Sequence, residues 1–444
     1  MSQDKGKNMS RITCKFGGTS LADAACVRDV VAIIKSNPDR RFIVPSAPGK
    51  RTPDDKKITD LLYAWHGIAR QGLDASEPKK MIEDRFLELA RELGVSFDIA
   101  PLLEEIGAQA GAYEAPDFMA SRGEYLNGRL VAEVLGAVFV DPAECVKFKS
   151  TGELDPVSYE LLGARLQGEG MFVVPGFYGA MPDGTVKTFS RGGSDVSGSI
   201  VARASKSDMY ENWTDVTGFR MTDPRIVPGA RKIDEITYTE LRELSYMGAT
   251  VLHDEAIFPV REPGIPIHIR NTKDPEAQGT LIVAARTAQT PVCGIAGRAG
   301  FTMFNIEKTL MNKERGFGVK VLGIFEEFDV NWEHMPTGID TMSVIVRDEE
   351  LKGRGDAIVE AVRRRVSPDE ISVTPGLAMI ATVGQGMNHH IGVAAKLCGA
   401  LSGAGVNIRV IDQGSSEMNI IIGVEEGDLK AAVGAIYNAF EAEA

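Results

Sequence analysis

The stretch Ile12-Thr-Cys-Lys-Phe-Gly-Gly-Thr-Ser20 decides the fold class of this chain. A short apolar run with strand character ends at two adjacent glycines, and apolar residues at helical spacing follow at positions 27, 30, 31 and 34. A strand, a glycine turn and a helix in succession form the unit from which α/β sheets are built. We therefore predict that an α/β domain begins here.

The same order of elements recurs through the first part of the chain. Residues 41–45, 137–140 and 171–174 are further strand candidates, and residues 58–68 carry a helical apolar pattern. Residues 77–110 are charged, have helical spacing and contain no strand candidate, so we expect a helical insertion over the sheet. This alternation predicts a sheet with helices on both faces.

The last part of the chain contains an internal repeat at an offset of 76 residues, as between Met303 and Met379. Asn312 and Asn388 match at the same offset, and so do many other pairs, which indicates two similar modules. Each copy predicts a strand, a helix, two strands and a helix, the order of a split βαβ sandwich. The expected elements are 301–306, 318–327, 329–335, 341–346 and 353–365 in the first copy, and 377–383, 392–402, 406–411, 418–423 and 429–441 in the second.

Composition excludes several classes of function. The chain has 444 residues, with 49 Lys and Arg against 62 Asp and Glu, a formal net charge of −13. Such acidity disfavours binding to nucleic acid or to anionic membranes. The five cysteines are scattered without metal-ligand spacing, which favours reduced thiols. No apolar run is long enough to span a membrane, and the first ten residues lack the apolar core of a signal peptide, so we expect a cytoplasmic enzyme that acts on small molecules.

Two motifs have the chemistry of an anion or ammonium site, although each also has a purely structural interpretation. Lys15 and the loop Gly17-Gly18 combine backbone N–H groups, a helix N-terminus and one cation, which suits a polyphosphate. Two glycines after a strand also form ordinary tight turns. Ser121-Arg-Gly-Glu124 is either a capping box at the start of a helix or a site where Glu124 binds an ammonium group.

Three later motifs extend this set. In Phe189-Ser-Arg-Gly-Gly-Ser-Asp195, Arg191 is suited to bind a carboxylate or phosphate, and the glycines permit close approach of a substrate, unless the segment is a surface turn. Trp213-Thr-Asp-Val216 ends a strand, and Thr222-Asp-Pro-Arg225 begins a turn. The common phosphate-binding GxxxxGK[ST] and protein-kinase motifs are absent from the sequence, so any kinase activity belongs to another fold.

Taken in order, these motifs resemble aspartokinases, the aspartate-specific branch of the amino-acid kinase family, over about residues 11–442. The resemblance rests on KFGGTS at 15–20, SRGE at 121–124, FSRGGSD at 189–195, WTDV at 213–216, TDPRIV at 222–227, MGATVLH at 247–253 and NTKDPEAQGTLI at 271–282. The repeat is similar to the paired ACT modules that serve end-product control in this family. The resemblance implies an amino-acid-kinase-type three-layer αβα sandwich over 11–288. Two ACT-like ferredoxin-type α+β modules would follow at 299–372 and 373–444, the second completed by a strand from 289–298.

The implied reaction is transfer of the ATP γ-phosphoryl group to the side-chain carboxylate of L-aspartate, giving 4-phospho-L-aspartate. This is the first step of the aspartate pathway to lysine, threonine and methionine. Because two anions must meet, catalysis should consist of charge neutralisation and positioning. Mg²⁺ would be held mainly by the oxygens of ATP, and we expect no protein metal site.

The family pattern also implies roles for individual residues. The catalytic residues would be Lys15, Asp195 and Arg191. Aspartate would be bound by Thr52, Glu124, Arg191 and Ser194. The nucleotide would be bound by Lys15, Gly17, Gly18, Thr19, Thr214, Asp215, Arg220 and Arg225. An effector, lysine or threonine or both, would be bound at a subunit interface of a homo-oligomer, a dimer or higher, by Met311, Glu314, Gly316, Phe317, Asn331, Glu333 and Asp340. For Glu333 and Asp340, solvated acidic loop residues are the alternative.

The sequence departs from the family pattern near the nucleotide. Thr250 stands where the family has a lysine, and Arg220, at a position that is often tyrosine, is the candidate to replace that charge. The departure keeps two alternatives open: an amino-acid sensor that binds without turnover, and a kinase for glutamate or N-acetylglutamate. The identity of the inhibitor and the oligomer number are not predicted.

Overall fold

The computed structural model describes residues 10–190, 192–249 and 251–441, and these divide into two compact units. The first unit contains the described residues through Phe219, together with 234–238 and 251–286. The second contains 220–233, 239–249 and the residues from 287 onward. The division therefore differs from a single boundary at residue 288, because two earlier segments pack with the C-terminal unit.

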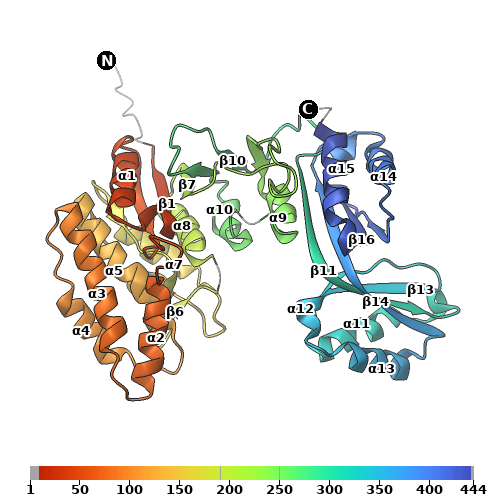
Figure 1. Cartoon of the computed structure of the whole chain (residues 1–444), viewed down its shortest axis with the longest axis horizontal. Coiled ribbons are helices and arrows are strands. Elements are labelled where there is room, and N and C mark those ends of the chain that lie inside the picture. Colours follow the sequence, from red (N-terminus) through yellow and green to blue (C-terminus); the bar gives the residue numbers. More distant parts are fainter. Residues whose placement is uncertain (1–9, 191, 250, 442–444) are drawn as a thin grey trace. The chain divides into compact units, whose positions relative to one another are not determined.

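An eight-stranded sheet forms the centre of the first unit as far as the structure describes it (Figure 1). The strand order is β3-β4-β2-β1-β7-β9-β10-β8, and every pair is parallel except β9 with β10. The strands are β1 Ile12–Phe16, β2 Arg40–Pro45, β3 Val138–Phe139, β4 Phe172–Val173, β7 Met209–Thr214, β8 Glu235–Thr237, β9 Ile267–Asn271 and β10 Thr280–Val283. A separate hairpin joins β5 Tyr178–Ala180 to β6 Val186–Thr188.

Strand β1 lies in the middle of this sheet, and all five of its residues are buried. Its side chains alternate between the two faces. Thr13 and Lys15 point toward helix α8, Gly193–Ala204, where Lys15 meets Asp195. Cys14 and Phe16 join the apolar core beneath helix α1, Ala24–Lys35. One strand therefore places a lysine on one face of the sheet and a hydrophobic anchor on the other.

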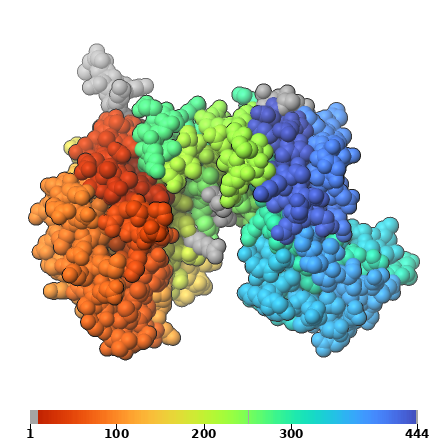
Figure 2. Space-filling view, in the orientation of Figure 1, coloured from red at the N-terminus to blue at the C-terminus, as the bar shows by residue number. Residues whose placement is uncertain are grey.

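Helices cover both faces of the sheet, as predicted. Helices α1 and α5 pack on one face and α8 on the other, with α7 and α10 against α8. Helices α2, α3 and α4 form an outer layer that shares a core with α5, and they make up the orange surface in Figure 2. Two of them, α3 and α4, are the helical insertion predicted over 77–110. The remaining bounds are α2 Ile58–Arg70, α3 Ser76–Leu93, α4 Ala100–Gln109, α5 Asp117–Leu135, α6 Pro142–Cys145, α7 Val157–Arg165 and α10 Phe258–Arg261, with short 3₁₀ turns at Gly18–Leu21 and Asp254–Ile257. Helix α9, Tyr238–Tyr246, belongs to the second unit from Thr239 onward.

Local sequence explains where the helices begin and end. The Asp23 side chain accepts a hydrogen bond from the Cys26 backbone N–H at 2.8 Å and so caps the start of α1. Helix α3 ends at Gly94, whose φ of +70° is the left-handed conformation that favours glycine.

The second unit is built on a six-stranded sheet in the order β12-β13-β11-β14-β16-β15, counted over the described residues. Its strands are β11 Gly294–Glu307, β12 Trp332–His334, β13 Thr341–Arg347, β14 Glu370–Val383, β15 Val410–Asp412 and β16 Asn419–Glu425. Its helices are α11 Phe317–Glu327, α12 Asp348–Leu351, α13 Gly355–Val366, α14 Val393–Gly403 and α15 Leu429–Glu441, with short 3₁₀ turns at Met311–Lys313, Met387–His389 and Glu426–Asp428.

The two long strands, β11 and β14, each serve both repeats. Residues 294–299 of β11 pair with 378–383 of β14, in the half of the sheet that also contains β16. Residues 303–307 of β11 pair with 370–374 of β14, next to β13. The predicted boundaries at 299 and 373 therefore fall inside continuous strands.

The segment 220–233 belongs to the core of this second unit. Met221 and Ala230 are buried among the side chains of α14 and α15. The Ile295 backbone N–H donates to the Met221 carbonyl at 2.6 Å, and the Arg231 N–H donates to the Tyr437 hydroxyl at 3.0 Å. Across both units, no helix among the described residues is long and apolar enough to cross a membrane.

Candidate active site

The carboxyl ends of the parallel strands of the first unit bring the predicted motifs together. This edge is where open α/β sheets bind ligands. After β1, the Gly17 N–H donates to the Trp213 carbonyl of β7 at 3.1 Å. After β2, the Gly49 N–H donates to the Gly18 carbonyl at 2.8 Å. A Cβ on Gly49 would lie 2.6 Å from the Gly18 oxygen, so this contact between the two loops requires a glycine.

Lys15 and Asp195 form the charged centre of this edge. Lys15 Nζ lies 2.6 Å from Asp195 Oδ1, and both side chains are largely buried. Asn212 on β7 donates to the same carboxylate oxygen at 2.9 Å. Burial alone would raise the pKa of Asp195, but the Lys15 ammonium and the Asn212 amide outweigh burial and hold that pKa below its ordinary value. The carboxylate is thus ionised and fixes the ammonium beside Gly17, where an added Cβ would lie 3.7 Å from Lys15 Nζ.

Glu124 provides a second titratable group at this site, and one of its carboxyl oxygens has no partner. It lies on α5 and is 7 % exposed, and its Oε2 atom has no hydrogen-bond partner. Burial raises the pKa of Glu124 to about 7, against hydrogen bonds from the backbone N–H groups of Ala47 and of Glu124 itself. A buried carboxylate oxygen without a donor is costly unless a ligand supplies one. Glu124 is therefore suited to receive a cation or an N–H donor.

The capping-box interpretation of Ser121 and Glu124 is wrong. Helix α5 begins at Asp117, a full turn earlier, and Ser121 is buried inside it, donating to the Phe118 carbonyl at 2.7 Å. The Asp117 carboxylate anchors the true start by accepting hydrogen bonds from the N–H and the hydroxyl of Thr188, at 2.8 and 2.7 Å. These residues are distant in sequence, which is why the local pattern indicated a later start.

The other predicted aspartate-binding residues are distributed around the same loops. Ser194 lies in the first turn of α8 and is so close to the loop after β4 that a Cβ on Gly176 would come within 2.8 Å of its hydroxyl. Thr52 is exposed on the loop that follows β2. Arg191 lies outside the described residues, as does Thr250. Gly192, with φ of +59°, begins α8.

Five of the predicted nucleotide-binding residues besides Lys15 lie at this edge: Thr214, Asp215, Gly17, Gly18 and Thr19. Thr214 and Asp215 end β7, and the Thr214 carbonyl accepts hydrogen bonds from the Thr272 N–H and hydroxyl at 2.9 and 3.1 Å. The Thr272 hydroxyl also lies 2.9 Å from that of Ser20, which ties the glycine loop, with Gly17, Gly18 and Thr19, to this strand end.

Arg220 and Arg225 belong to the second unit. Arg220 Nη1 donates to the Ala230 carbonyl at 2.8 Å, and Arg225 pairs with Asp223 at 2.7 Å. These hydrogen-bond partners of Arg220 and Arg225 therefore lie within the second unit itself.

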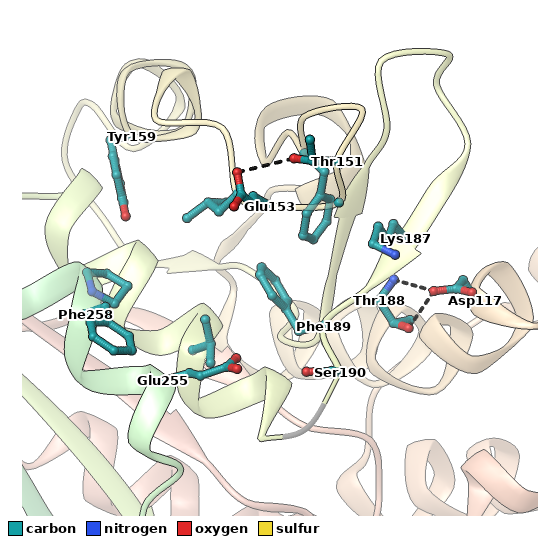
Figure 3. Close-up of a pocket in the computed structure, with 15 residues that line it drawn as sticks. Asp117, Thr151, Glu153, Tyr159, Lys187, Thr188, Phe189, Ser190, Glu255 and Phe258 are labelled. Carbon is teal, nitrogen blue, oxygen red and sulfur yellow. Dashed lines mark hydrogen bonds between the residues drawn. The ribbon is translucent and has the colours of Figure 1, made fainter. Parts of the chain in front are cut away.

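A separate cavity of about 920 Å³ adjoins the segment that leads to Arg191 (Figure 3). Its floor is apolar and includes Phe148 and Phe189, whose ring centroids are 4.9 Å apart. Glu153, Lys187 and Glu255 line the same cavity. The described residues that line this cavity do not include Lys15, Asp195 or Glu124.

The predicted effector residues of the second unit fall into three groups. Met311 and Phe317 are buried in the core of the first module. Gly316, with φ of +76°, begins α11, and Asn331 and Asp340 are exposed. The acidic pair Glu314 and Glu333 is described next.

Both of these glutamates already have cationic partners. Hydrogen bonds from Lys308 and Lys320, each at 2.6 Å, hold the pKa of Glu314 below its ordinary value. Glu333 lies 2.8 Å from Arg347 Nε, and its side chain is only 5 % exposed. Glu333 is therefore not a solvated loop residue.

The sequence interpretation missed three residues of the strand-end site. Asn212 holds Asp195, Gly49 packs on Gly18, and Asn127 donates to the Ser46 carbonyl at 2.6 Å. The position of Asn212 could have been predicted, because successive side chains of a strand point to opposite faces of the sheet. With Trp213 on one face, Asn212 must lie on the other, toward α8. Gly49 and Asn127 depend on contacts between loops and helices that the sequence does not place.

Comparison with known proteins identifies two kinds of domain in the chain. The model of the amino acid kinase family matches residues 10–271, and an ACT domain model matches residues 380–440. The chain is 39% identical to aspartokinase 3 of Bacillus subtilis over 96% of this chain and 98% of that protein.

Solved structures agree over the whole length. The aspartate kinase of Clostridium acetobutylicum is 47% identical, with a TM-score of 0.89, covering 97% of this chain and 100% of that one. Aspartokinase III of Escherichia coli, 27% identical, has been solved with aspartate and ADP, with a TM-score of 0.77 over 97% of this chain and 100% of that one. Its complex with lysine and aspartate gives a TM-score of 0.73 over 97% and 99% of the two chains.

Proposed function

This chain belongs to the aspartokinases of the amino acid kinase family, and we propose that it transfers the γ-phosphoryl group of ATP to the side-chain carboxylate of L-aspartate. The observation that carries the proposal is the strand-end site. A buried lysine held by Asp195 stands beside a glycine loop, and a buried carboxylate with an unpartnered oxygen, Glu124, lies next to the adjoining loop. The lysine and the glycine loop suit a phosphate group, and the buried glutamate suits the ammonium group of an amino acid.

The charge on the phosphoryl group is the main obstacle to the reaction, because the attacking carboxylate is also an anion. Lys15 supplies a positive charge at the transferring phosphate. The N–H of Gly17 already donates to the Trp213 carbonyl, so we assign the phosphate oxygens to the N–H groups of the glycine loop that follow Gly17. Asp195 acts by orienting the Lys15 ammonium, and its own carboxylate is already occupied by Lys15 and Asn212. The side chains thus neutralise charge and fix direction, without a covalent intermediate.

Recognition of aspartate divides between its two ends. Glu124 accepts a hydrogen bond from the α-ammonium group through its unpartnered oxygen. The positive charge of the bound ammonium favours the ionised form of the Glu124 carboxyl group, whose pKa burial has raised. We assign a carboxylate of the substrate to Arg191, and further hydrogen bonds to Thr52 and Ser194. This division selects an amino acid that has both an ammonium and a side-chain carboxylate.

The nucleotide would bind along the ends of β1 and β7. Thr214 and Asp215 are placed there, and Arg220 and Arg225 are assigned to it by the family pattern alone. Among the described residues, no group of three His, Cys, Asp or Glu side chains could hold a metal ion. Mg²⁺ would enter as a companion of ATP held mainly by phosphate oxygens, because this ion prefers few protein ligands.

We propose that the second unit regulates this activity by binding lysine, since the related Escherichia coli enzyme has been solved with lysine. The residues assigned to the effector are Met311, Glu314, Gly316, Phe317, Asn331, Glu333 and Asp340. Threonine as a second effector and a homo-oligomer formed through the ACT modules belong to the same proposal. All five cysteines are unpaired, which suits the reducing cytoplasm in which we place the enzyme.

One assay tests the reaction against its alternatives. ADP release is measured with L-aspartate, glutamate and N-acetylglutamate as acceptors, each with and without lysine and threonine. We expect ADP release with aspartate and its suppression by lysine. Release with glutamate or N-acetylglutamate only would change the substrate, and binding of amino acids by a folded chain without ADP release would make the protein a sensor.

A further inference from the structure

Arg85 is a buried arginine on the amphipathic outer helix α3, and it is outside every motif that identifies the family. Only 5 % of the surface of Arg85 is exposed to solvent. Its guanidinium donates to three acceptors: Asp55 Oδ2 at 2.6 Å, the Ala22 carbonyl at 2.7 Å and the Gly49 carbonyl at 2.8 Å. An arginine is rarely buried unless such partners compensate it.

The three acceptors belong to the loops of the proposed site. Ala22 follows the glycine turn after β1, and Gly49 lies on the loop that joins β2 to α2. Asp55 is on the loop that also carries Thr52. From the outer helical layer seen in Figure 1, Arg85 therefore links the turn that would bind the phosphates to two points of the loop that carries Thr52.

This linkage is reinforced from the side of the loops. Gly49 accepts a hydrogen bond from Arg85 through its carbonyl and donates its N–H to the Gly18 carbonyl. The loop that Arg85 holds is therefore itself hydrogen-bonded to the glycine turn. Hydrogen bonds from Arg51 and then Arg85 hold the pKa of Asp55 well below its usual range, so this acceptor stays charged. A planar guanidinium reaches three acceptors at once, and a lysine ammonium of similar charge cannot reproduce that fork.

We propose that Arg85 is a positioning residue for phosphoryl transfer. It holds the turn after β1 and the loop after β2 at the distance from one another that the reaction requires. The inference rests on the proposed function, because positioning has meaning only for a site that turns over. Arg85 touches neither substrate nor nucleotide in this scheme. It acts through Ala22, Gly49 and Asp55, and misplacement of reacting groups by such loops is costly to catalysis.

The test compares Arg85→Ala, Arg85→Lys and the control Arg91→Ala, which removes an exposed arginine near the end of the same helix. Steady-state kinetics are measured in the full chain with aspartate and ATP varied, in the presence and absence of guanidinium chloride at concentrations well below those that unfold proteins. We expect kcat/KM for aspartate to fall by about a hundredfold in Arg85→Ala, with a raised KM for aspartate. Guanidinium ion should restore part of this activity in Arg85→Ala but none in Lys15→Ala, and Arg91→Ala should match the wild type.

Arg85→Lys keeps a positive charge and carries the test if Arg85→Ala does not fold. We expect the lysine variant to fold and to retain the raised KM for aspartate. Kinetic constants within twofold of the wild type in either folded variant would overturn the inference. The inference would also be overturned if guanidinium ion restored no activity and the variant differed from the wild type only in having a smaller fraction of active protein, with an unchanged KM for aspartate. A wild-type chain that released no ADP with aspartate would overturn the proposed function as well, which separates the two failures.

Discussion

At the scale of single residues, the charged centre gives the most direct prediction. Lys15→Ala removes the ammonium that faces the transferring phosphate, and we expect kcat to fall by at least about a hundredfold, the usual cost of losing one electrostatic stabiliser. Arg191→Ala should cause a loss of the same order. Lys35→Ala, an exposed lysine at the end of α1, serves as the control and should be neutral. ADP release by folded protein is the measurement, and wild-type rates in Lys15→Ala would refute the role assigned to it.

Glu124 predicts a pH dependence with a definite sign. Burial raises its pKa to about 7 from an ordinary value of 4.5, so between these values the folded chain keeps a proton that the unfolded chain has lost. The stabilising contribution is therefore complete below the unfolded pKa and is lost as the pH rises through 7. An ammonium ligand needs the ionised form, so the KM for aspartate should decrease as the pH rises through this region.

The matched variant is Glu124→Gln, which keeps the size of the side chain and removes its titration. We expect its KM for aspartate to be higher by about 10- to 100-fold, the worth of one hydrogen bond to a charged group, and independent of pH near 7. The measurement is the KM for aspartate between pH 5.5 and 8.5, a range of about three units around the shifted pKa. A variant that kept the wild-type pH profile would show that another group titrates.

At the scale of elements, the order of strands and helices could be predicted because apolar periodicity is a local property. The strand of residues 12–16 and the helices of both repeats lie close to their predicted places. The start of α5 was predicted a turn too late, because Thr188, far along the chain, anchors Asp117. The same limit applies to Arg85, whose acceptors lie on loops that the fold alone brings together.

The close contact between the loops after β1 and β2 predicts that adding one methyl group at Gly49 will destabilise the protein. In Gly49→Ala the new Cβ would lie 2.6 Å from the Gly18 oxygen, so the loops must separate. We expect the free energy of unfolding to fall by about 1–3 kcal/mol, the cost of overpacking, together with a loss of activity. Urea unfolding and ADP release measure the two effects.

Gly67→Ala is the matched control for this substitution. Gly67 lies within α2 and a Cβ there would meet nothing within 4 Å, so the change should be neutral or should stabilise the helix by up to about 1 kcal/mol. Equal effects of the two substitutions would contradict the proposed packing between the loops.

At the scale of the whole molecule, the linear order of the sequence does not match the compact units. The repeat at an offset of 76 residues predicted two modules, yet β11 and β14 pass through both of them. Met221 and Ala230, which precede the predicted boundary at 288, complete the core around α14 and α15. Such long-range packing is set by surface area buried between distant segments, and periodicity within a segment contains no information about it. The net charge of −13 likewise describes the chain as a whole, whereas the site depends on individual cations such as Lys15.

Regulation is also a property of the whole molecule, and the ion pair of Glu333 with Arg347 provides a test of it. If Glu333 receives the ammonium group of lysine, then Arg347 competes with that ligand for the same carboxylate. Arg347→Met leaves the nearly buried Glu333 carboxylate without this cationic partner, although its hydrogen bond with Tyr246 remains, and this should strengthen its attraction for another cation. We expect lysine to inhibit ADP release at about a tenfold lower concentration, which corresponds to about 1.4 kcal/mol of binding free energy. Arg365→Met breaks a more exposed pair with Glu327 and should leave the response to lysine unchanged. An unchanged or weaker response in Arg347→Met would mean that Glu333 stabilises the module and takes no part in binding the effector.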